Sequence, residues 1–112
     1  MFRYSYFPYG SRIKLMAPNL INFSLGLEGD WSDDIESAYL YVPNATNLSY
    51  AFASRMALTN ISGAFYNATD ISGLCSSCYN LSNTIYTPNA INMAHAYSSF
   101  YSLRTATFSP NI

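Results

Sequence analysis

Pro-Asn-Ala-Thr-Asn-Leu, residues 43–48, is a phrase that the chain repeats along its length. It returns as Tyr-Asn-Ala-Thr-Asp-Ile at 66–71 and as Pro-Asn-Ala-Ile-Asn-Met at 88–93, and a fainter copy, Pro-Asn-Leu-Ile-Asn-Phe, stands at 18–23. Another copy begins at 110. The first Asn residues of successive copies are 25, 23, 22 and 22 residues apart. A period in this range predicts a solenoid, in which similar coils stack on one another.

Each copy continues with the same order of polar and apolar residues. With the first Asn taken as position 0, position +3 is Asn or Asp, and positions +4, +7 and +8 are mostly apolar. Apolar residues at this spacing lie on one side of a helical turn. An Asn or Asp in front of them can accept a hydrogen bond from an unpaired helix N–H. The pattern therefore predicts one capped helical turn in each copy.

A short strand is expected after each helical turn. Leu58, Leu81 and Leu103 occupy position +14, and the residues after them alternate as in a strand. Parallel strands of successive coils would form one sheet, and each coil would bury its apolar side against its neighbours. The expected fold is an α/β repeat, a short solenoid of parallel strands with one-turn helices on the return side.

The repeats also suggest how the chain is divided. Residues 1–11, rich in Phe and Tyr, are expected to form an N-terminal aromatic cap or arm. Residues 12–112 are expected to form the solenoid, with about four coils and a first strand at Arg12–Ala17. Because no polar repeat follows the last copy, we expect an uncapped C-terminal end. An open end of this kind favours self-association or a protein partner.

The Asn and Asp residues of the copies are expected to be structural. Such side chains hydrogen-bond backbone groups at tight corners, and stacked coils would align them into a ladder. The expected ladder consists of Asn44, Asn47, Asn67, Asp70, Asn89 and Asn92.

The composition disfavours several functional classes. Only 10% of the residues are charged and the formal net charge is −1, so the basic surface of a nucleic-acid binder is missing. No apolar run approaches the roughly 20 residues that span a bilayer. With 11 Tyr and abundant Ser, Thr and Asn, the surface is expected to be uncharged and prone to association. This composition favours an extracellular, cell-surface or virion location.

Few residues are placed for chemistry. Cys75 and Cys78 have the spacing of a redox or zinc motif. Cys75 falls at the inward position that Phe52 and Tyr97 fill in other copies, so buried structural thiols are expected, with a disulfide or a metal site as alternatives. His95 is the only residue that could add a third metal ligand. The acidic segment Glu28–Glu36 is expected to be a solvated loop, with a calcium site as the alternative. We predict no catalytic residue, metal or cofactor, and no enzyme.

Aromatic side chains are the best candidates for contact with a ligand or partner. Tyr and Trp suit stacking on sugars and on other proteins, since one end is apolar and the other polar. The candidates are Trp31, Tyr50, Tyr79 and Tyr101.

The phrase and the apolar positions after it resemble the BspA-type leucine-rich repeats, which include repeats in surface lipoproteins of mycoplasmas and other bacteria. Arg55 and Phe100 stand where that family often has Cys, and residues 28–36 depart from the pattern. The resemblance implies a leucine-rich-repeat solenoid used for adhesion or assembly in surface or phage structural proteins, and it brings no catalytic residues. The residues that carry it include Asn44, Thr46, Asn47, Leu48, Phe52, Leu58, Asp70, Ile71, Cys78, Leu81, Asn92, Met93, Tyr97 and Leu103.

Two functions follow as hypotheses. The first is a non-enzymatic structural or protein-interaction module of a surface or virion assembly. The alternative is an adhesin domain that binds a carbohydrate or a receptor.

Overall fold

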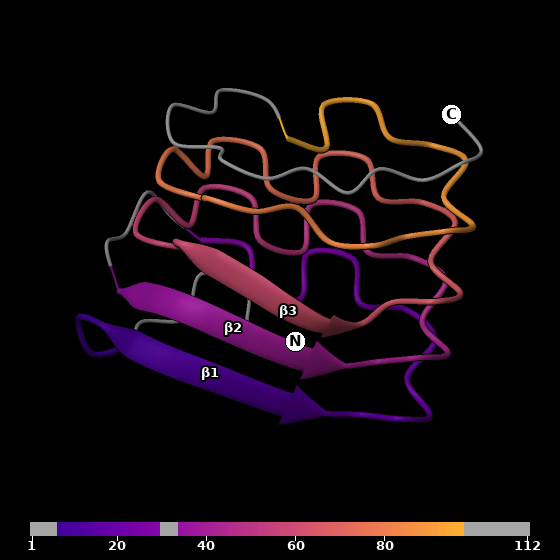
Figure 1. Cartoon of the computed structure of the whole chain (residues 1–112), viewed down its shortest axis with the longest axis horizontal. Coiled ribbons are helices and arrows are strands. Elements are labelled where there is room, and N and C mark those ends of the chain that lie inside the picture. The colour runs from indigo at the N-terminus through magenta and orange to yellow at the C-terminus, as the bar shows by residue number, and fades with distance from the viewer. Residues whose placement is uncertain (1–6, 30–33, 98–112) are drawn as a thin grey trace.

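Three parallel strands form one open sheet in the computed structural model, which describes residues 7–29 and 34–97. They are β1 (Ser11–Met16), β2 (Ile35–Tyr41) and β3 (Asn60–Ala64), and they lie side by side in this order. A long return segment follows each strand, and the return segments lie above the sheet in Figure 1. The apolar residues of both parts face the space between them.

The register of the sheet aligns side chains of one kind in rows. Ile13 pairs with Ala38, which pairs with Ile61. Ala38 and Ile61 are buried, and Ile13 packs against the same core. On the opposite face Lys14 pairs with Tyr39, and its Nζ lies 5.8 Å from the centre of the Tyr39 ring. This alternation explains why a polar and an apolar face form on one short sheet.

The return segments pair with one another in the same parallel sense. Isolated bridges join position +3 of each copy to position +3 of the next: Asn22 to Asn47, Asn47 to Asp70, and Asp70 to Asn92. Further backbone hydrogen bonds continue the pairing, such as Leu48 N to the Asp70 oxygen at 2.8 Å. Successive copies of the phrase therefore lie against each other in register.

The helical turns predicted from the phrase are absent from the described copies, and that prediction is wrong. Position +6 of every described copy has a positive φ: Leu25 (60°), Tyr50 (55°), Gly73 (62°) and His95 (58°). A right-handed helix needs φ near −63°, so each segment makes a β-turn at this residue. The turn is closed by hydrogen bonds such as Ala51 N to the Leu48 oxygen at 3.1 Å.

The predicted fold class is therefore also wrong. The described residues contain three parallel strands in one open sheet and no helix, and not an α/β leucine-rich-repeat solenoid with helices on the return side. The radius of gyration is 12.4 Å. A compact domain of this length has about 13 Å. The molecule is a compact globule.

The strand expected after Leu81 does not form either. Where the backbone of that strand would bond β3, the side chain of Asn83 does so instead. Its Oδ1 accepts from Ile61 N at 3.1 Å, and its Nδ2 donates to the Ile61 oxygen at 2.7 Å. The Tyr97 hydroxyl accepts from Ile85 N at 3.2 Å. Side chains thus take bonds that a fourth strand would have taken, and the described sheet ends at β3.

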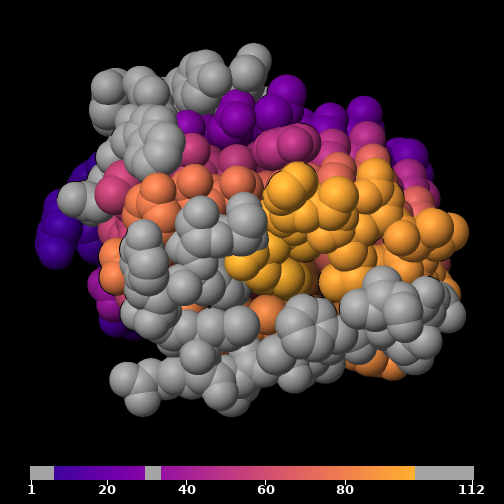
Figure 2. Space-filling model, turned by 90° about the horizontal axis from the view of Figure 1, so that it is seen from above, coloured from indigo at the N-terminus to yellow at the C-terminus, as the bar shows by residue number. Residues whose placement is uncertain are grey.

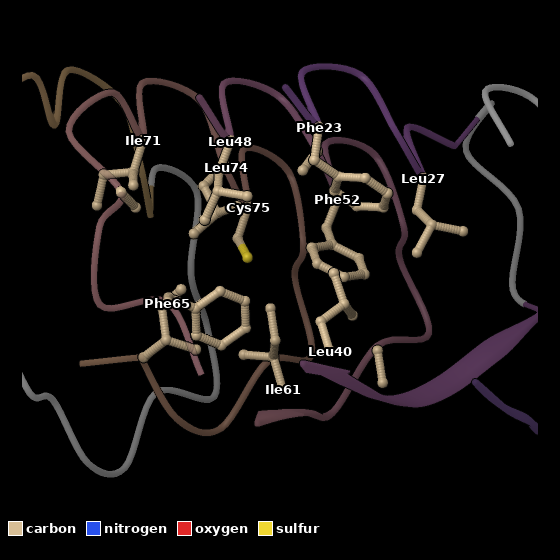
Figure 3. Close-up of a cluster of buried hydrophobic side chains, with 14 of the residues drawn as sticks. Phe23, Leu27, Leu40, Leu48, Phe52, Ile61, Phe65, Ile71, Leu74 and Cys75 are labelled. Atoms are coloured by element: carbon tan, nitrogen blue, oxygen red, sulfur yellow. The ribbon is translucent and has the colours of Figure 1, made fainter. Parts of the chain in front are cut away.

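The core lies between the sheet and the return segments (Figure 3). Leu48, Leu74 and Phe23 enter it from the return segments, while Leu40 and Ile61 enter it from the strands. All five are at most 1% exposed. Each buried side chain of this size contributes about 1.5–3 kcal/mol. Positions +4, +7 and +8 are thus the inward side of a turn, although that turn is not helical.

The last described residues, which end at Tyr97, form the end of the described molecule that lies opposite β1. They are coloured orange and yellow in Figure 2. Ile91 on this part of the chain is 78% exposed.

Most of the expected aromatic arm at 1–11, together with Leu103 and the copy that begins at 110, lies outside the described residues. Among the described residues, no helix has the length and apolar character needed to cross a membrane.

Candidate functional site

The first Asn of each copy fixes the corner of the chain to the preceding copy. Asn44 donates an Nδ2–H to the Pro18 oxygen at 2.7 Å, and Asn67 does the same to the Pro43 oxygen at 2.8 Å. Asn89 donates to the Tyr66 oxygen at 2.7 Å. The three acceptors are the equivalent residue of the preceding copy, one position before its own Asn. The three amides are therefore held in one orientation, one above another.

The second Asn or Asp of each copy sets the turn that replaces the predicted helix. Its Oδ1 accepts from the backbone N–H two residues later: Asn47 from Ser49 at 2.9 Å, and Asp70 from Ser72 at 3.0 Å. Asn92 accepts from Ala94 at 3.2 Å. This is an Asx-turn, in which the side chain mimics a backbone turn. The same side chain that favours a helix start thus also favours the competing structure.

A groove of about 520 Å³ runs along the copies at this corner. Its lining repeats one pair of positions, 0 and +2, in successive copies. The lining residues are Asn19, Ile21, Asn44, Thr46, Asn67, Thr69 and Asn89, none of them charged. Three of the six expected ladder residues, Asn44, Asn67 and Asn89, line this groove, and the other three form the Asx-turns. The groove itself was not anticipated from the sequence.

The polar atoms that the groove offers include both acceptors and donors. The Asn amides direct N–H groups to backbone oxygens, and Thr69 donates its hydroxyl to the Thr46 oxygen at 3.2 Å. Within the described residues, the oxygens of the lining amides accept only one side-chain contact, from Asn67 Nδ2 to Asn44 Oδ1 at 3.5 Å. Their lone pairs, and those of the Thr hydroxyls, can accept hydrogen bonds, and the amide N–H groups that are not bonded to backbone oxygens can donate them.

The two predicted aromatic contact residues that the structure describes, Tyr50 and Tyr79, do not line this groove. Tyr50 is 42% exposed, and a side chain at Gly73 would overlap its ring, so the ring covers the backbone of the next copy. Tyr79 is half-buried. Trp31 and Tyr101 lie outside the described residues.

A buried ion pair, which the sequence did not reveal, joins the long segment before β2 to the return segment after it. Arg55 Nη1 lies 3.1 Å from both carboxylate oxygens of Asp34, and its Nε donates to the Leu27 oxygen at 2.7 Å. The Asp34 carboxylate also accepts from the backbone N–H groups of Phe7 and Ile35. Arg55 is completely buried and Asp34 is 5% exposed. The expectation of a solvated acidic loop is therefore wrong at Asp34.

Arg55 and Cys78 occupy the same position, +11, in their copies. Cys78 Sγ donates to the Phe52 oxygen at 3.1 Å, and Arg55 Nε donates to the Leu27 oxygen. Both acceptors are at position +8 of the preceding copy. In the sequence, Arg55 was one of two departures from the Cys position, and only the structure shows that its guanidinium makes a buried contact there.

Cys75 and Cys78 are both free and fully buried. Burial, together with the neighbouring Cys78 side chain, raises the pKa of the Cys75 thiol well above its usual value. Burial and the proximity of Cys75 likewise raise the pKa of Tyr97. A thiol that stays protonated at neutral pH is a poor nucleophile and a poor metal ligand. Among residues 7–29 and 34–97, no three His, Cys, Asp or Glu side chains are grouped so as to hold a metal ion.

Comparisons of the chain with protein-family models, with curated proteins and with solved structures find no match. The resemblance to BspA-type repeats stays a prediction from the residues quoted above.

Proposed function

We propose that the chain is a non-enzymatic structural and protein-interaction module, part of a surface or virion assembly, that associates with copies of itself. The observation that carries this proposal is the exposure of large apolar and aromatic side chains on an almost uncharged surface. Tyr66 and Tyr86 are 54% and 52% exposed, Ile91 is 78% exposed, and Tyr39 is 39% exposed. Such side chains are enriched in protein interfaces, and few charges are present to prevent contact.

The chemistry of the described residues also supports a role without catalysis. The buried ion pair of Arg55 and Asp34 is made between two residues of the fold itself. The raised pKa of the buried Cys75 thiol disfavours its reactive thiolate form. His95 is exposed, at a turn that recurs in each copy. A catalytic acid or base normally lies in a cleft, within hydrogen-bond reach of the group whose proton it transfers, and an exposed turn is not such a place.

Sedimentation velocity over a range of protein concentrations tests the proposal. We expect the full chain to associate reversibly, and the variant Tyr39→Ser/Tyr86→Ser to associate at least tenfold more weakly, because each buried aromatic contributes about 1 kcal/mol or more at an interface. Ser62→Ala is the matched control. Ser62 is exposed and pairs with Tyr39 in the sheet, and its replacement removes no aromatic ring. A chain that stays monomeric at millimolar concentration contradicts the proposal.

An adhesin domain is the second candidate, and the uncharged groove at the corner of the copies favours it. A recessed surface with fixed amides and hydroxyls can recognise a polar ligand, whereas exposed aromatic residues alone favour protein contact.

A further inference from the structure

We propose that the groove lined by Asn19, Asn44, Thr46, Asn67 and Thr69 binds a neutral oligosaccharide whose chain lies along the stack of copies. This inference rests on the proposed binding role of the chain, and it assigns the ligand class and the residues of one site. The ladder side chains thereby have a second role besides holding the corner.

The first argument is the balance of donors and acceptors. The Nδ2–H groups of Asn44, Asn67 and Asn89 are directed to backbone oxygens, at 2.7–2.8 Å. The Thr69 hydroxyl donates to the Thr46 oxygen. The groove therefore offers amide and hydroxyl lone pairs, together with the second N–H groups of Asn44 and Asn89, the amide of Asn19 and the Thr46 hydroxyl as donors. Its ligand must carry groups that both donate and accept hydrogen bonds. A polyhydroxylated sugar has this chemistry.

The second argument is charge. No Lys, Arg, Asp or Glu is among the seven lining residues that the structure describes, so this lining offers no cation to a phosphate, sulfate or carboxylate. This disfavours nucleic acids, sulfated glycans and polyuronic acids, and it favours a neutral sugar chain.

The third argument is the regular geometry of the lining. Because the copies pair in parallel register, equivalent side chains recur at about 4.8 Å. The distance from Asn19 to Asn89 covers three such steps, about 14 Å in all. The amides of Asn44, Asn67 and Asn89 are held in place by their backbone bonds, so little side-chain freedom is lost there on binding. A ligand that repeats its own hydroxyl groups along one axis can meet such a ladder in each copy.

Tyr66 is the exposed aromatic residue next in sequence to this ladder, although it is not one of the lining residues. It directly precedes Asn67, its backbone oxygen accepts from Asn89, and its side chain is 54% exposed. Aromatic rings of this kind pack against the apolar faces of sugar rings.

An array of immobilised oligosaccharides, with neutral, uronic-acid and sulfated members, tests the proposal on the full chain. We expect binding to neutral members only. Thr69→Val keeps the shape of the side chain and removes the hydroxyl, so it should weaken binding to the best neutral member about three- to tenfold. Thr59→Val is the matched control. Thr59 lies outside the groove, is also exposed, and donates its hydroxyl to the Glu36 oxygen of the preceding copy at 3.0 Å.

Each outcome decides the inference. Binding to a neutral member that falls with Thr69→Val, and not with Thr59→Val, supports it. Absence of binding to every neutral member, equal binding to sulfated members, or equal effects of the two variants overturns it. The same array is repeated with the Tyr39→Ser/Tyr86→Ser variant, since glycan binding should persist there. If the wild-type chain self-associates and binds no sugar, the groove inference fails while the proposed function stands.

Discussion

Arg55 shows most directly how one residue can decide local structure. Its guanidinium is fully buried, bonds Asp34 and the Leu27 oxygen, and lies 5.5 Å from the centre of the Phe7 ring. It thereby joins three segments that are far apart in the sequence. Removing one member of a buried ion pair is costly because the other charge is left without compensation.

Arg55→Met should therefore lower the free energy of unfolding by about 3–5 kcal/mol. Methionine retains much of the apolar volume, so the loss reports mainly on the charge of Asp34. Urea unfolding of the variant and the wild type measures it. Arg12→Met is the control, because Arg12 Nη2 lies 3.8 Å from Glu36 in an exposed pair. An exposed pair contributes at most about 1 kcal/mol. Equal losses in the two variants would contradict the prediction.

At the scale of single elements, Asn83 determines where the described sheet ends. Its side chain satisfies both backbone groups of Ile61, as a neighbouring strand would, but it cannot continue the ladder. An unpaired buried backbone group costs about 1–3 kcal/mol.

Asn83→Val should accordingly destabilise the fold by about 1–3 kcal/mol, although valine is the better strand former. The amide hydrogen of Ile61 should also exchange faster with solvent, because it loses its acceptor. Hydrogen exchange followed by NMR measures the second effect. Asn80→Val is the matched control, since exposed Asn80 makes one comparable bond to the Met56 oxygen at 2.7 Å, away from β3. Unchanged protection of Ile61 in Asn83→Val would exclude this role.

The elements also show what the sequence could and could not predict. The strand expected at Arg12–Ala17 is found as β1 at Ser11–Met16, and the pattern after Leu58 leads to β3 at Asn60–Ala64. Alternation was sufficient there because one face of each strand is buried. The helical turns were predicted wrongly because Leu25, Tyr50 and His95 have a positive φ, which such residues normally disfavour. The identity of these residues therefore gave no sign of the turn. At Leu25 and Tyr50 the backbone N–H bonds the next copy, at the Ser49 and Ser72 oxygens, and these bonds accompany that conformation.

The candidate site was predictable only in part, for a similar reason. Repetition alone marked Asn44, Asn67 and Asn89 as a set with a shared role. Their acceptors are carbonyl groups one copy away, and the bonds depend on the parallel register of the copies. The orientation of the amides, and so the set of donors and acceptors that the groove offers, follows from these bonds. No spacing in a single sequence contains that information.

The whole molecule is held together by contacts between copies more than by contacts within them. Backbone bonds join Phe23 to Asn47, Leu48 to Asp70, and Ile71 to Asn92, which are 24, 22 and 21 residues apart. These separations are about 0.2 of the chain length, a value typical of domains dominated by non-local pairing. Without helices among the described residues, little local structure can form before the copies meet.

Folding should consequently be slow for a chain of 112 residues, with a main phase of milliseconds to seconds, because loop closure must precede the bonds between copies. Stopped-flow refolding from urea, followed by tyrosine and tryptophan fluorescence, measures this phase. The unfolding interval is kept to a few seconds, so that the five prolines do not isomerise and add a slower phase. Asn67→Ala tests the link to the copies: it removes the bond to the Pro43 oxygen, which spans 24 residues. If this bond forms late, the variant should unfold faster and refold at the wild-type rate. Refolding of the wild type within microseconds, as in helical bundles, would show that local contacts dominate.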